Sequence, residues 1–77
     1  MITPAQCKGA RAMVDLSRRD LAERAGIAER TLVDFERGAR TPHPNNLSAI
    51  RRALESAGVE FIPENGGGPG VRLRKGG

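Results

Sequence analysis

The chain has 77 residues, enough for one small domain that buries only a modest amount of surface. Its net charge of +4 and isoelectric point near 10.6 fit a polyanionic partner. No apolar run approaches the roughly 20 residues of a membrane span, no signal-peptide pattern begins the chain, and the single cysteine cannot form an internal disulfide. These features exclude a membrane-spanning helix and favour the cytoplasm.

The first predicted helix runs from Pro4 to Val14. Thr3 can cap it, proline suits the first helical position, and Gln6 stands where a capping box needs a glutamine. Leu16 should continue the core across the link to the next helix. The apolar face of this first helix is predicted to comprise Cys7, Ala10, Met13 and Val14, which makes the cysteine a plain core residue.

Two short helices joined by a tight glycine turn are predicted between Ser17 and Gly38. Ser17 can cap the first of them, with Asp20 at the capping-box position. Gly26 ends that helix, because glycine enters the left-handed conformation without a Cβ penalty. The second helix begins at about Ala28. Helices joined in this way meet at a steep angle, which is the helix-turn-helix geometry that sends the second helix into the major groove of DNA.

A fourth helix is predicted from Pro44 to about Ala57, and its buried stripe comprises Leu47, Ile50, Ala53, Leu54 and Ala57. Hydrophobicity then alternates in 59–62 and again in 71–74, which predicts a β-hairpin around a glycine-rich tip. Because an isolated hairpin is marginal in water, it must lean its apolar face on the helices or pair its edge with a second subunit. That face comprises Val59, Phe61, Val71 and Leu73. The tail Lys75-Gly76-Gly77 should fray.

One pattern covers about residues 6–57, most of the chain. It consists of Leu21-Ala22, Ala25-Gly26-Ile27, Thr31-Leu32, Phe35-Glu36-Arg37-Gly38 and Pro42. It resembles the Cro and phage-repressor family of helix-turn-helix transcription regulators. The resemblance implies a mainly α fold, a four-helix repressor-like DNA-binding domain, here with a C-terminal β-hairpin where many relatives carry a fifth helix. We expect residues 1–58 to form the DNA-binding domain and residues 59–77 the hairpin and basic tail of the same compact unit.

The resemblance also implies roles for individual residues. Phosphate contacts are expected from Arg18, Arg19, Arg37, Arg40, Thr41 and His43. Base contacts are expected from Glu29, Arg30, Val33 and Asp34, with arginine suited to guanine, carboxylates to cytosine and valine to the thymine methyl group. An internal ion pair between Arg11 and Glu36 is implied as well, although the residues alone leave open two solvated charges.

The sequence therefore predicts a sequence-specific DNA-binding transcriptional regulator, a repressor or controller that binds an inverted-repeat operator as a dimer. Its expected partners are double-stranded DNA and a second copy of the chain, with the C-terminal hairpin as a candidate interface. The alternative is a protein-interaction module on the same scaffold, such as an antitoxin or an anti-activator, because the third helix is acidic and the hairpin offers an edge for a partner. No enzyme, metal or cofactor is expected, since the sequence offers no nucleophile with a base and no metal cluster.

Overall fold

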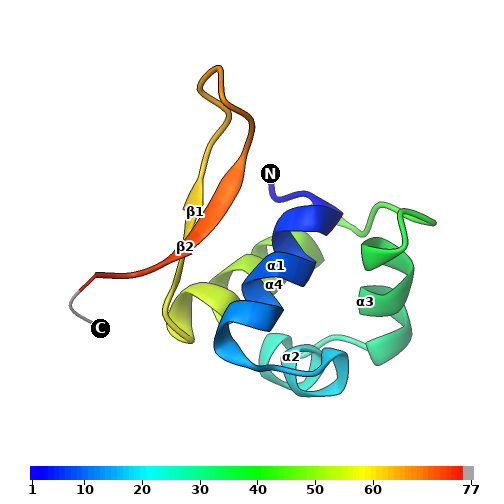
Figure 1. Cartoon of the computed structure of the whole chain (residues 1–77). Helices are drawn as coiled ribbons and strands as arrows, with labels where there is room; N and C mark the ends of the chain where they lie inside the picture. Colours follow the sequence, from blue (N-terminus) through cyan, green and yellow to red (C-terminus); the bar gives the residue numbers. More distant parts are fainter. Residues whose placement is uncertain (76–77) are drawn as a thin grey trace.

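A computed structural model describes residues 1–75 and has the predicted order of elements (Figure 1). The elements are α1 (Pro4–Val14), α2 (Arg18–Ala25), α3 (Glu29–Glu36), α4 (Pro44–Ser56), β1 (Val59–Ile62) and β2 (Gly70–Leu73). The mainly α fold with a C-terminal hairpin is thus confirmed. No helix within residues 1–75 is long and apolar enough to cross a membrane. Of the tail that was predicted to fray, residues 76 and 77 lie outside the described residues.

Local hydrogen bonds explain why the helices begin and end near their predicted positions. The Thr3 hydroxyl accepts from the backbone amide of Gln6, whose side chain accepts from the amide of Thr3 in return, completing the capping box. The Ser17 hydroxyl accepts from the amide of Asp20 at the start of α2. Gly26, at a φ of 71°, ends α2 in the left-handed region, where a side chain would be strained.

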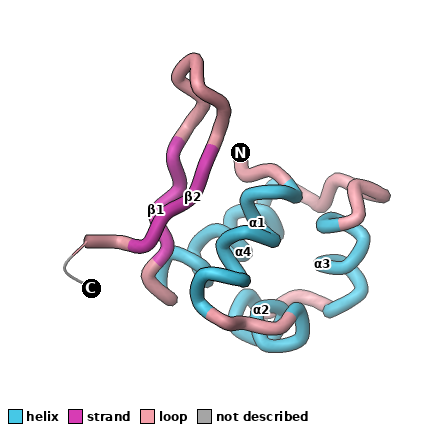
Figure 2. Tube along the Cα trace, in the orientation of Figure 1, coloured by secondary structure: helices cyan, strands magenta, loops and turns pink. Residues whose placement is uncertain are grey.

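The core lies between the four helices and one face of the hairpin (Figure 2). Its largest fully buried side chains are Leu21, Leu32, Ile50, Leu54, Val59 and Cys7. Ile2, which precedes α1, is also buried, although the sequence pattern did not assign it to the core. The four helices and β1 all contribute to this set, so the helix-turn-helix and the hairpin share one hydrophobic core.

The hairpin packs with β2 against α1 and β1 against both α4 and α1. Its strands are antiparallel, with Val59 opposite Leu73 and Glu60 opposite Arg72. The side-chain amide of Gln6 donates to the carbonyl oxygen of Gly70 at 3.0 Å. Gln6 therefore caps α1 with one end and holds the hairpin with the other.

Two side chains that were predicted to face the core are exposed. Met13 keeps 44% of its surface in contact with solvent, and Leu73 keeps 56%. The hairpin contacts the first two turns of α1, where Gln6 bonds to it and where a methyl group on Gly9 would touch Val71 at 3.5 Å. It leaves the last turn of α1 and the end of β2 uncovered. The prediction was wrong because apolar spacing does not reveal how far a neighbouring element extends.

A buried ion pair joins α1 to α3. The Nε and Nη2 atoms of Arg11 donate to the two carboxylate oxygens of Glu36 at 2.7 and 2.8 Å, and Nη1 donates to the carbonyl oxygen of Leu16 at 3.0 Å. The Glu36 side chain is 1% exposed and that of Arg11 is 19% exposed. The hydrogen bonds to Glu36 raise the pKa of Arg11 above its ordinary value. The carboxylate is thus neutralised where water cannot reach it.

The thiol of Cys7 is part of the same cluster. Its Sγ atom donates to Glu36 at 3.1 Å, and the side chain is fully buried. Burial raises the pKa of Cys7 far above its ordinary value, and the hydrogen bond to the carboxylate raises it further. The cysteine is therefore a core residue that also supplies a donor, and it is unreactive in the folded protein.

Arg11→Met should lower the free energy of unfolding by about 3–5 kcal/mol, because it leaves a buried carboxylate without a countercharge. Glu36→Gln should cost less, since the arginine that remains reaches water. Urea unfolding of both single variants and of the double variant measures the effect, and the double variant should be more stable than Arg11→Met. Arg19→Met, which removes an exposed ion pair with Glu23, is the control and should change stability by less than about 1 kcal/mol. Coincident unfolding curves for Arg11→Met and wild type would contradict the role of the pair.

Stability should also fall as the pH rises above about 9, the ordinary pKa of a thiol. Above that pH the unfolded chain loses the Cys7 proton whereas the folded chain keeps it, so ionisation favours the unfolded state by about 1.4 kcal/mol per pH unit. Cys7→Ser keeps a donor for Glu36 but does not ionise in this range. The difference in unfolding free energy between wild type and this variant should therefore shift between pH 8 and pH 10. A constant difference would mean that Cys7 ionises equally easily in both states.

Candidate nucleic-acid interface

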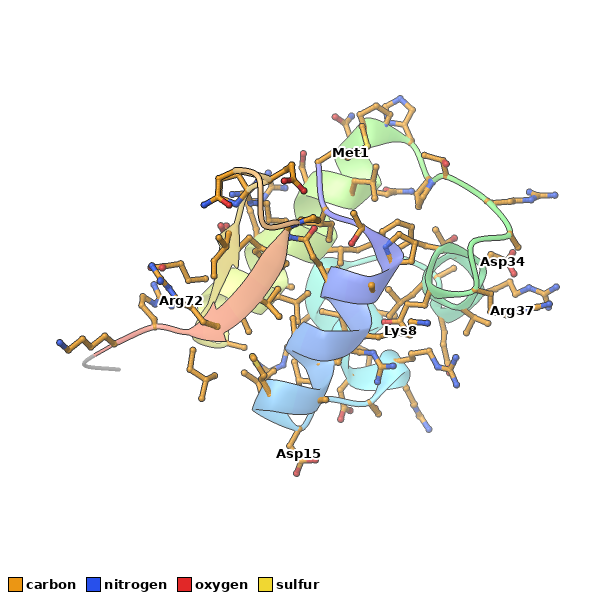
Figure 3. The ribbon with its side chains drawn as sticks, turned by 45° about the horizontal axis from the view of Figure 1, so that its top comes forward. Met1, Lys8, Asp15, Asp34, Arg37 and Arg72 are labelled. Carbon is orange, nitrogen blue, oxygen red and sulfur yellow. The ribbon has the colours of Figure 1, made fainter. Side chains whose placement is uncertain are left out.

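The α2–turn–α3 unit presents one side of α3 to solvent. Leu21 and Ala22 fix α2 to the core, and Leu32 and Phe35 fix α3. Figure 3 shows Asp34 and Arg37 on the outer side of α3, across the molecule from Arg72 in the hairpin. Ala28, the residue before α3, provides no side-chain cap, so the amides of the first turn have no such acceptor. The position of α3 therefore depends on its buried face.

The four residues that were predicted to contact bases lie on this outer side, but they are not equally accessible. Glu29 and Arg30 are exposed, whereas Val33 and Asp34 are half-buried. The Nε atom of Arg30 donates to both carboxylate oxygens of Asp34, at 3.1 and 3.3 Å. The Arg30 side chain is 81% exposed and that of Asp34 only 16% exposed. Asp34 is thus placed to hold Arg30, a contact that the sequence analysis did not anticipate although the two residues are four apart on a helix.

The terminal nitrogens of Arg30, Nη1 and Nη2, remain available for another partner. Only Nε donates to Asp34, and within residues 1–75 the two terminal nitrogens make no hydrogen bond. The carboxylate orients the guanidinium and offsets part of its charge. Such an arrangement leaves a two-donor edge for a pair of acceptors, such as the O6 and N7 atoms of guanine.

The residues that were predicted to contact phosphates form two groups on either side of α3. Arg18 and Arg19 stand at the exposed start of α2, and Arg37, Arg40 and Thr41 are exposed in and before the loop that leads to α4. A hollow of about 340 Å³ separates this loop from α3, and Arg30, Arg40, Thr41 and His43 are among its lining residues. Within residues 1–75, no carboxylate lies within ion-pair distance of Arg18, Arg37 or Arg40. These three guanidiniums give the two flanks their positive charge.

His43 has a structural role that the sequence analysis missed. It is the capping residue of α4, and its Nδ1 atom accepts a hydrogen bond from the backbone amide of Asn45 at 3.1 Å. The neutral ring therefore carries its proton on Nε2, which is the nitrogen left to meet a phosphate. The signal was available in the sequence, because Pro44 marks the first position of the helix and so marks its predecessor as the cap.

Comparison with protein-family models gives a match over residues 8–61 to the family described as helix-turn-helix. The match covers the helices from the second turn of α1 onwards and extends into β1. The chain matches none of the curated proteins with which it was compared. The chain belongs to the helix-turn-helix family, in agreement with the resemblance to Cro and phage repressors, and it is a DNA-binding transcriptional regulator.

Proposed function

We propose that the protein is a repressor or controller that binds an inverted-repeat operator as a homodimer in the cytoplasm. Residues 1–58 contact DNA, and residues 59–77 complete the same compact unit. The observation that carries the proposal is the outer side of α3, where an exposed guanidinium is held by a carboxylate and arginines without ion-pair partners stand on both flanks.

The flanks supply affinity that does not depend on sequence. Arg18 and Arg19 meet one sugar-phosphate strand, and the loop after α3 meets the other with Arg37, Arg40, Thr41 and His43. Support for this division comes from the exposure of all six residues. Since guanidinium groups bind phosphate in a bidentate way, the arginines also fix the register of the protein on the duplex.

Selectivity comes from the front of α3. Arg30 reads guanine, Glu29 accepts from cytosine, and the half-buried Val33 packs against a thymine methyl group. Asp34 acts mainly through Arg30, because its carboxylate is already hydrogen-bonded to that side chain. In a homodimer, two such helices about 34 Å apart match half-sites separated by one turn of DNA.

A second candidate function is a protein-interaction module, such as an antitoxin or an anti-activator. The observations that favour it are the exposed carboxylate of Glu29 on α3 and the uncovered apolar side chains Met13 and Leu73. Co-purification of a stoichiometric protein partner, together with no DNA binding at low salt, would select this candidate over the first.

DNA binding should weaken steeply with salt. About three phosphate contacts per subunit predict a slope near −5 in a plot of log affinity against log salt concentration for the dimer. Fluorescence anisotropy on DNA selected by the protein from random sequences measures this slope, and Arg37→Ala should make it shallower by about 1 to 2 while lowering the affinity for all sequences. Arg52→Ala, which removes an exposed arginine of α4 outside the proposed contacts, is the control. An affinity that does not change with salt would rule out this mode of binding.

Arg30 and Asp34 should affect selectivity more than affinity. Arg30→Ala should reduce discrimination at one base pair of each half-site by about 1–3 kcal/mol. Asp34→Asn removes a negative charge near DNA, so electrostatics alone predicts tighter binding to all sequences, whereas loss of the hold on Arg30 predicts weaker discrimination at the same base pair. Asp20→Asn is the matched control, because it removes an exposed charge from α2 without touching Arg30. Unchanged discrimination in Asp34→Asn would mean that Asp34 does not orient Arg30.

A further inference from the structure

The loop between β1 and β2 carries an asparagine followed directly by a glycine. Asn65 and Gly66 are both exposed, and Figure 1 shows this loop extending away from the helices. A backbone nitrogen can attack the side-chain carbonyl carbon of the asparagine before it, because the product is a five-membered ring. Nothing shields the nitrogen here, since Gly66 has no side chain and a methyl group placed on it would meet no atom beyond its chain neighbours within 4 Å.

Hydrogen bonds in the loop hold the reacting groups as this attack requires. The amide of Gly66, which supplies the nucleophile, donates to Oε1 of Glu64 at 2.7 Å. The Oδ1 atom of Asn65 accepts from the amide of Gly67 at 3.4 Å. This second bond spans the peptide between residues 65 and 66, so it turns the side-chain carbonyl of Asn65 back toward the main chain. The nitrogen therefore has a proton acceptor, and the carbonyl oxygen has a donor for the charge that it would acquire.

Glu64 is itself held in place by the loop. Its Oε1 atom also accepts from the amide of Gly68 at 3.0 Å, so one carboxylate oxygen joins two amides of the glycine-rich tip. In the described part of the chain, residues 1–75, no arginine or lysine lies within ion-pair distance of Glu64. No cation therefore competes with the amide of Gly66 for this carboxylate.

The other two asparagines of the chain lack this arrangement. Asn45 and Asn46 lie in the first turn of α4. The nitrogens that follow them, those of Asn46 and Leu47, both donate to the carbonyl oxygen of His43, at 2.9 and 3.1 Å. A helical backbone keeps each of these nitrogens directed along the helix axis, away from the side chain of the preceding residue. Asn65 alone of the three thus combines an open nucleophile with a carboxylate to accept its proton.

We propose that Asn65 is a site of self-modification by deamidation, at which the chain converts this asparagine into a succinimide and then into isoaspartate and aspartate. The Gly66 nitrogen bonds to Cγ of Asn65 as its proton passes to Glu64, and the amide of Gly67 donates to the oxyanion on Oδ1. The carbonyl then re-forms, the Cγ–Nδ2 bond breaks, and Nδ2 takes the proton from Glu64 and leaves as ammonia. A water molecule adds to either ring carbonyl and breaks its bond to the Gly66 nitrogen, which yields isoaspartate or aspartate and releases one proton.

The modification changes the tip of the hairpin and leaves the rest of the molecule in place. A new carboxylate beside Glu64 lowers the net charge of +4 by one. Isoaspartate also lengthens the main chain by one carbon atom, which displaces the amide of Gly66 from Glu64. Below the tip, the side-chain amide of Gln6 donates to the carbonyl oxygens of Ile62 and Gly70, at 3.5 and 3.0 Å, and these two residues are the last pair of the hairpin. This anchor separates the changed segment from the helices.

Incubation of the full folded chain at neutral pH, followed by mass spectrometry of its fragments, tests the site. Asn65 should lose its amide about tenfold faster or more than Asn45 and Asn46, and isoaspartate, which forms only through the ring, should be among the products. The folded chain should also react about threefold faster or more than the chain unfolded in guanidinium chloride, where only the local sequence acts. Equal or slower reaction in the folded chain, or aspartate without isoaspartate, would overturn the proposal.

Glu64→Gln tests the proton acceptor separately. Glutamine has the same size and can accept from both loop amides, but it does not take up a proton, so the folded variant should react about threefold more slowly or less than wild type. In guanidinium chloride the two chains should react equally. Glu60→Gln is the matched control, because it removes a carboxylate from β1 of the same hairpin, and its rate should stay within about twofold of wild type. Equal rates for folded Glu64→Gln and wild type, or equal slowing in Glu60→Gln, would overturn the role of Glu64.

Discussion

The placement of α3 depends on one buried charge. Glu36 is the last residue of α3, and its carboxylate is almost completely shielded from water. A carboxylate in that position is tolerated only because Arg11 and Cys7, both on α1, point donors at it. Since α3 has eight residues and no side-chain cap, it would not be stable alone. Contacts with α1 and α2 therefore determine where its outer side points.

The structure separates the outer side of α3 from the hairpin. The front of α3 and its arginine flanks lie on one side of the molecule, and the hairpin lies on the other, with α1 and α4 between them. α1 connects the two surfaces, because it pairs with α3 through Arg11 and holds the hairpin through Gln6. A partner bound to the hairpin would thus leave the outer side of α3 uncovered.

The sequence predicted the elements well because their boundaries are encoded locally. The capping box at Thr3 and the glycine after α2 lie within a few residues of the helix ends that they fix, and alternation identified the hairpin. Features that depend on residues far apart in the sequence were harder to predict. The approach of Arg11 to Glu36 was implied only by resemblance, and the exposure of Met13 and Leu73 depends on where the hairpin crosses α1. The hold of Asp34 on Arg30 was overlooked, since both residues had been assigned to bases separately.

The acidity of α3 can be understood from that same contact. A carboxylate near DNA repels phosphates, and this would weaken binding to any sequence if it stood alone. Paired with Arg30, it leaves Glu29 as the remaining charge on the front of α3, so in the proposed function sequence-independent attraction comes from the flanks. At a matching base, Arg30 can bond to guanine and keep Asp34 satisfied at the same time. At a mismatched base the terminal nitrogens lose their acceptors, and the partly buried carboxylate still faces the duplex. In the proposed function the carboxylate would therefore lower affinity for all sites slightly and for mismatched sites most, which would increase the ratio of specific to non-specific affinity.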